Sequence, residues 1–132
     1  MRLFPPAYLV GRRALADYSV PNTNYVLPAG TVVILSQYLL HRDLRFWDAP
    51  EEFRPQRWLE DRPRRGFVYF PFGAGPRICI GEQFAWMEGV LVLATIARRW
   101  RVDVVPEQKI AVQPIITLRP KYGMRARVTR RA

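Results

Sequence analysis

The sequence predicts a small mixed fold in which one long helix follows a region of short strands and turns. Twelve prolines divide most of the 132-residue chain into short segments. Residues 81–100 contain no proline, and apolar side chains occupy most of their positions. β-Branched residues are concentrated in residues 31–35, directly after a Pro-Ala-Gly turn. A helix and a strand are therefore predicted for these two segments.

The remaining elements follow from shorter signals. Residues 9–15 and 25–27 are predicted to be extended, and with residues 31–35 they form a small sheet in the first third of the chain. Ser36 is expected to cap a short helix that reaches Leu40. A long meander rich in Arg, Asp, Glu, Pro and Trp follows. Two runs near the C-terminus, residues 110–118 and 124–128, are predicted to form a terminal hairpin.

Composition excludes several classes of protein. The chain has 21 Lys and Arg against 11 Asp and Glu, a net charge of +10, and 49% hydrophobic residues. That apolar content excludes a mainly disordered basic tail. One cysteine and one histidine cannot build a disulfide framework or a tetrahedral zinc site. The first residues are not expected to be a signal peptide, and no apolar stretch is expected to cross a membrane.

The predicted helix is apolar around most of its circumference. Few polar residues interrupt it between Phe84 and Ala97. Helices of this kind are normally buried, and so short a chain has little with which to bury one. The helix is therefore expected to lie inside something larger.

Residues 69–81 contain the chain's single cysteine, Cys79, in a run of glycines and prolines. The glycines at 73, 75 and 81 are expected to let the backbone turn tightly and approach a flat ligand. The start of the long helix would favour the thiolate form of Cys79. One thiolate is too few for zinc but sufficient for haem iron, because the porphyrin supplies four donors.

This segment resembles the haem-binding signature of the cytochrome P-450 family, F-x-x-G-x-R-x-C-x-G. Phe72, Gly75, Arg77, Cys79 and Gly81 occupy its specified positions. Residues 53–58 are similar to the family's F-x-P-E-R-F/W segment, with Gln56 in place of the usual Glu. Residues 2–6 resemble the end of the E-x-x-R helix, and residues 117–120 resemble part of the C-terminal hairpin.

The resemblance implies a mainly α fold with small β-sheets, of which this chain is the C-terminal, haem-binding portion of one domain. Its implied divisions are the helix end and small sheet (1–40), the meander (41–68), the cysteine-ligand loop (69–81), the long buried helix (82–101) and the terminal hairpin (102–132). The family's paired glutamate would precede Met1. Arg2 and Arg57, which belong to its buried ion network, are then expected to lack that acidic partner.

The resemblance also assigns functions to individual residues. Cys79 would ligate the iron of haem b, and its electron donation favours O–O cleavage. Arg77 and Arg12 would bind haem propionates, and Phe72 would pack beside the ring near Gly73, Gly75 and Gly81. The apolar stretches 7–10 and 114–117 would line a pocket for a lipophilic substrate; the candidates are Ala7, Val10, Ile115 and Ile116. His41 is expected to be structural, with a bond to backbone or a turn cap.

The implied activity is insertion of one oxygen atom from dioxygen into a lipophilic organic substrate. The arginine excess, including Arg98, Arg99 and Arg101, would form a basic face for an acidic electron donor such as a ferredoxin or a flavin reductase. Two alternatives stay open: a truncated, catalytically inactive haem-binding module, and a basic interaction module that binds nucleic acid, which no motif favours. The isolated chain is expected to be inactive, and the location to be cytoplasmic.

Overall fold

The computed structural model describes residues 1–59 and 67–131. The chain divides into two compact units, Met1–Pro71 (unit 1) and Phe72–Ala132 (unit 2). Each unit has its own strand pairs, so the two are described in turn.

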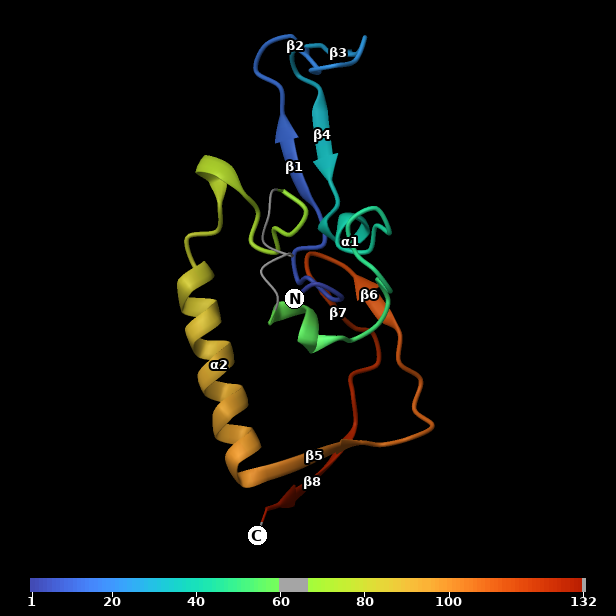
Figure 1. The fold of residues 1–132 in the computed structure, drawn as a ribbon, viewed down its shortest axis with the longest axis vertical. Coiled ribbons are helices and arrows are strands. Elements are labelled where there is room, and N and C mark those ends of the chain that lie inside the picture. The colour runs from blue at the N-terminus through green and yellow to red at the C-terminus, as the bar shows by residue number, and fades with distance from the viewer. Residues whose placement is uncertain (60–66, 132) are drawn as a thin grey trace. The chain divides into compact units, whose positions relative to one another are not determined.

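Unit 1 begins with two antiparallel strand pairs (Figure 1). Strand β1 (Val10–Arg13) pairs with β4 (Val32–Leu35), in a register that places Val10 opposite Leu35. Strand β2 (Tyr18–Ser19) pairs with β3 (Val26–Leu27). The three extended segments predicted for this region are confirmed. Together with β2, which was not predicted, they form two two-stranded sheets where one small sheet was predicted.

A short helix, α1 (Gln37–Leu40), follows β4 and is capped as predicted. The Ser36 hydroxyl accepts a hydrogen bond from the Leu39 amide at 3.3 Å, which satisfies one donor of the first turn. The described part of the predicted meander contains turns and a 3₁₀ helix, η1 (Pro55–Trp58). Residues 60–66 of that meander lie outside the described residues.

The interior of unit 1 is aromatic and polar. Trp47 is 3% exposed. Among the described residues, it is the one large hydrophobic side chain that is buried. Its ring centroid lies 6.1 Å from those of Trp58 and Tyr69, which are 4.7 Å from each other. Such separations suit tilted ring packing. The side chains buried with Trp47 include three that carry charge or can acquire it, namely Arg2, His41 and Arg57.

Unit 2 contains the predicted long helix, α2 (Glu82–Arg99), which leads directly into β5 (Trp100–Val104) (Figure 1). The helix was predicted to include residues 100 and 101. Trp100 instead has extended backbone angles (φ −132°, ψ 143°), because it and Arg101 pair with Arg130 and Thr129.

The burial of α2 that was predicted inside something larger is not provided by the described residues of this chain. None of its residues is buried, and Phe84, Leu91 and Leu93 are 59–70% exposed. The described residues of unit 2 supply no layer that would cover the whole circumference of the helix. In the described part of the chain, neither helix has the length and apolar character needed to cross a membrane.

The terminal hairpin is present with a different pairing. Strands β6 (Val112–Pro114) and β7 (Leu118–Pro120) pair with each other, because residues 115–117 form a turn inside the segment predicted to be one strand. Strand β8 (Ala126–Arg130) pairs with β5. The described residues hold two α-helices against eight short strands, so small sheets predominate in this portion, whereas the resemblance implied a mainly α fold for the whole domain.

Candidate functional site

The loop before α2 turns at two glycines. Gly73 and Gly75 have φ values of +78° and +72°, which residues with a Cβ adopt at a cost. Gly75 begins a short 3₁₀ helix, η3 (Gly75–Arg77), and the amide of Ile78 donates to the Gly75 carbonyl at 3.0 Å. The loop is thus a defined sequence of turns.

Cys79 is held by its own backbone and leaves its side chain available. Its amide donates to the Phe72 carbonyl at 2.9 Å, and its carbonyl accepts from the Glu82 amide at 3.3 Å. The thiol is free and exposed. Through these two bonds the backbone of Cys79 is tied to Phe72 on one side and to the first turn of α2 on the other.

Gly81, the residue before α2, does not need glycine's conformational freedom. Its φ of −86° is open to any residue, which corrects the expectation that all three loop glycines serve a tight turn. A Cβ at Gly81 would lie 3.7 Å from Cys79 Sγ, an ordinary contact distance. A side chain there would therefore occupy space beside the sulfur.

An aromatic contact that the sequence analysis missed fixes the other end of the loop. The rings of Phe72 and Trp86 meet edge to face, with centroids 5.7 Å apart. The Trp86 indole N–H donates to Glu82 Oε1 at 3.4 Å, a pairing of residues four apart on a helix. The spacing of four residues between Glu82 and Trp86 is the sequence signal from which this side-chain pairing could have been predicted. The contact holds Phe72, whose carbonyl accepts from Cys79.

The side chains around Cys79 fit a flat apolar group with anionic substituents, as haem is. Ile78 and Ile80 are 47% and 103% exposed on either side of the thiol, and Arg77 is exposed two residues before it. No three Asp, Glu, His or Cys side chains gather as a metal site within residues 1–59 and 67–131. The described donor set thus offers one cysteine sulfur and a nearby guanidinium, which suits a metal whose other ligands come from a macrocycle.

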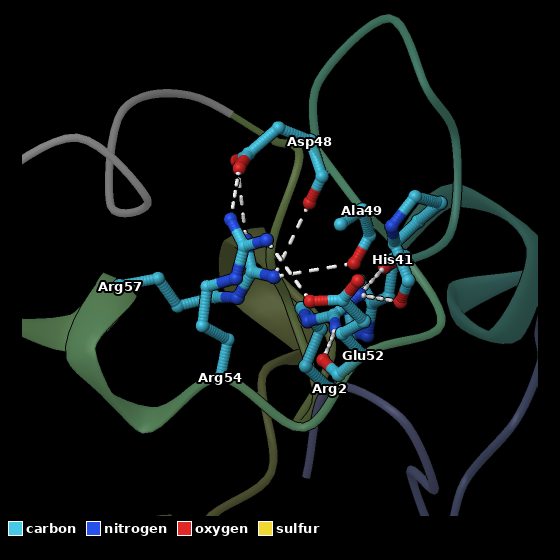
Figure 2. Close-up of polar contacts among 8 residues, drawn as sticks. Arg2, His41, Asp48, Ala49, Glu52, Arg54 and Arg57 are labelled. Carbon is cyan, nitrogen blue, oxygen red and sulfur yellow. Dashed lines mark hydrogen bonds and ion pairs between the residues drawn. The ribbon is translucent and has the colours of Figure 1, made fainter.

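Arg2 lies buried in unit 1 and binds backbone carbonyls. Its Nη1 donates to the carbonyls of His41 at 2.7 Å and Pro50 at 2.6 Å, and its Nη2 donates to that of Glu52 at 3.1 Å. Figure 2 shows Arg2 beside His41 and Glu52. Burial lowers the pKa of Arg2, and the positive charges of Arg57 and Arg42 lower it further. Carbonyl oxygens are therefore the atoms that compensate this charge directly.

Arg57 has an acidic neighbour other than the family's paired glutamate. Its Nη1 donates to Asp48 Oδ1 at 3.3 Å, and its Nη2 donates to the carbonyls of Asp48 and Ala49 (Figure 2). Asp48 is 78% exposed and also binds Arg54, so its attraction for Arg57 is screened by water. The sequence analysis did not consider Asp48 because its pairing spans nine residues of irregular chain.

His41 is structural, as expected, and it binds backbone on two sides. Its amide donates to the Gln37 carbonyl at the end of α1, and its ring Nε2 accepts from the Phe70 amide at 3.1 Å. Burial lowers the pKa of His41 to about 4, and the charges of Arg2 and Arg42 add to this, although an interaction with the backbone of Arg2 opposes it. The ring is therefore neutral near pH 7.

Comparison with known proteins gives the family. The family model described as "Cytochrome P450" matches residues 1–124. The chain belongs to the cytochrome P450 family. A probable cytochrome P450 6d4 of Drosophila melanogaster is 35% identical over 133 residues, covering 99% of this chain and 26% of the relative. Carotene epsilon-monooxygenase of Arabidopsis thaliana is 34% identical, covering 99% of this chain and 25% of the relative.

A solved structure agrees with the assignment to the P450 family. The crystal structure of a cytochrome P450 (CYP102L1) matches with a TM-score of 0.87 and 31% identity, covering 98% of this chain and 29% of that one. This chain therefore spans about a quarter of the length of the P450 relatives that it matches. The family implies a haem cofactor.

The other P450 site candidates lie on strands and turns of the two units. In unit 1, Arg12 is exposed on β1, Val10 begins that strand half-buried, and Ala7 is exposed before it. In unit 2, Ile115 and Ile116 are 43% and 92% exposed in the turn between β6 and β7. The first three belong to a different unit from Cys79.

The basic residues predicted to face an electron donor are exposed in unit 2. Arg98 and Arg99 lie in the last turn of α2, where cations are favourable near the helix C-terminus. Arg101 lies on β5 and donates to both carboxylate oxygens of Asp103, at 3.0 and 2.9 Å. Its charge is thus partly neutralised, which leaves Arg98 and Arg99 as the stronger candidates.

Proposed function

We propose that this chain is the haem-binding portion of a haem-thiolate monooxygenase, with Cys79 as the iron ligand. The observation that carries the proposal is the loop itself: two glycines at positive φ, a cysteine held by backbone bonds on both sides, and a free exposed thiol. When bound, haem b would supply the activation of dioxygen. The chain's residues would hold and orient it.

Each loop residue would have a definite task. Cys79 would offer its sulfur from a fixed backbone, so little conformational freedom is lost on binding. Arg77 would pair with a propionate by charge-assisted hydrogen bonds, and Arg12 is the second candidate for that task. Phe72, held by Trp86, would limit the access of water to the sulfur.

The rest of the proposal concerns substrate and partners. The substrate is a lipophilic molecule, in line with the apolar character of Ala7, Val10, Ile115 and Ile116 and with the name of the carotene-oxidising relative. The electron donor is an acidic protein that binds near Arg98 and Arg99. The exposed apolar surface of α2 supports a larger domain around this portion, without which the 132 residues alone would be poorly folded and inactive.

The experiment is a carbon monoxide difference spectrum of the protein expressed from its complete reading frame. The wild type is expected to show the thiolate-type Soret band of the ferrous complex, and Cys79→Ala is expected to lose it. Gln83→Ala, at an exposed position in the first turn of α2, is the matched control and should keep the band. A thiolate-type band that survives in Cys79→Ala would refute the assignment.

Haem retention tests the propionate contact separately. Arg77→Ala is expected to weaken haem binding by about tenfold, the loss of one charge-assisted hydrogen-bonded pair, and Arg77→Lys by less. Dialysis against a haem acceptor such as apomyoglobin measures this. Equal retention by all three proteins would remove Arg77 from the site.

A further inference from the structure

His41 is a buried side chain in unit 1 whose ring touches the first residues of the cysteine loop. It is fully buried, and its ring centroid lies 5.0 Å from that of Tyr69 and 5.6 Å from that of Phe70. The contact joins residues 29 positions apart. The sequence between them includes the whole meander.

The ring acts as a hydrogen-bond acceptor. Nε2 accepts the Phe70 amide proton at 3.1 Å, so the neutral ring carries its own proton on Nδ1. The low pKa of His41 is consistent with this neutral state, since a protonated ring has no lone pair to accept with. The carbonyl of the same residue accepts from Arg2 at 2.7 Å, which holds the His41 backbone in place.

Phe70 lies two residues before Phe72, the first residue of the haem-binding signature. The next residue is Pro71, which has no amide proton, and the one after it is Phe72, whose carbonyl accepts from the Cys79 amide at 2.9 Å. Only Pro71, whose ring fixes its φ, separates Phe70 along the chain from the residue that holds the cysteine backbone.

We infer that His41 is a positioning residue for the Cys79 loop: its Nε2 anchors the Phe70 amide and thereby fixes where the loop starts. The inference rests on the proposed function of Cys79 as the haem ligand. His41 acts through the backbone and touches neither iron nor substrate. What it requires is an acceptor atom three bonds beyond Cβ.

The test compares variants that keep or remove that acceptor. His41→Gln places an amide oxygen three bonds from Cβ, as Nε2 is. His41→Asn places its oxygen only two bonds out, and His41→Phe keeps an aromatic ring without an acceptor. All are expressed from the complete reading frame, and near-ultraviolet circular dichroism verifies that each is folded. The thiolate-type Soret band of the ferrous carbonyl complex is measured per haem bound.

The thiolate-type fraction of the ferrous carbonyl complex is expected to stay within about twofold of wild type in His41→Gln and to fall by at least about fivefold, relative to the non-thiolate form, in His41→Phe and His41→Asn. Amide hydrogen exchange at Phe70 is the second measurement. Its rate should be at least about tenfold higher in His41→Phe than in His41→Gln. This second measurement requires no haem.

Separate outcomes overturn the two claims. A wild type that lacks the thiolate-type band overturns the proposed function and this inference with it. A wild type with the band and a His41→Phe variant with the same fraction overturns the inference alone. So does a folded His41→Gln variant whose fraction falls as far as that of His41→Phe.

Discussion

Lowering the pH should destabilise unit 1 through His41. The ordinary histidine pKa is about 6.5, and burial lowers that of His41 to about 4 in the folded chain. Between these values the unfolded chain binds more protons than the folded chain, so stability falls as the pH is lowered through this range. Above pH 6.5, the full contribution of the neutral ring to the free energy of unfolding is present.

The size of the effect follows from the difference between the two pKa values. One pH unit corresponds to about 1.4 kcal/mol, and the values differ by about 2.5 units, so roughly 3 kcal/mol of unfolding free energy is lost between pH 7 and pH 4. Asp43 affects the free energy of unfolding over a lower range of pH. Its hydrogen bond from Arg45 lowers the pKa of Asp43 to about 2, so its own contribution is lost below pH 3.8.

The assay is urea unfolding of the protein expressed from its complete reading frame, followed by tryptophan fluorescence, to which Trp47, buried in unit 1, contributes. His41→Gln is the control, since it keeps an acceptor for the Phe70 amide and cannot titrate. The free energy of unfolding of wild type minus that of His41→Gln should decrease by about 3 kcal/mol from pH 7 to pH 4. A difference that stays constant over this range would refute the argument that His41 is buried in its neutral form.

Three further predictions use the same unfolding assay at pH 7. Gly75→Ala should cost about 1–2 kcal/mol because φ is +72°, whereas Gly81→Ala, at φ −86°, should stay within about 0.5 kcal/mol of wild type; equal losses would contradict the backbone argument. Ser36→Ala should cost about 1 kcal/mol through the lost cap of α1, and Ser36→Thr much less. Arg57→Ala should cost about 2–3 kcal/mol because it leaves two carbonyls without their donor, and Asp48→Ala under about 1 kcal/mol because its carboxylate is exposed; the reverse order would contradict the hydrogen bonds described.

Features that depend on neighbouring residues could be predicted from the sequence. The Ser36 cap, the extended residues 31–35 and the helix after Gly81 each follow from a local pattern, and the structure contains all three. The bends in the cysteine loop could also be predicted from neighbouring residues. Its glycines were predicted to bend the chain, which is confirmed at Gly73 and Gly75.

Features that depend on distant residues could not be predicted in the same way. The sequence contains several short apolar runs of similar character, and nothing local shows that Val128 pairs with Val102 across β5 and β8. The binding of the Phe70 amide by His41 joins residues 29 positions apart, which no local pattern indicates. The role of Arg2 as a donor to three carbonyls likewise follows from turns formed about 40 to 50 residues later.

The pairing of β5 with β8 determines when this part of the chain can finish folding during synthesis. Residues 105–125 separate the two strands, so β5 has no partner from this pair until residues 126–130 have been translated. At about 5–20 residues per second, that interval lasts on the order of a few seconds. Throughout it, the edge of β5 is an unpaired strand that another nascent chain could bind. The rate of translation after residue 104 therefore bears directly on the yield of soluble protein.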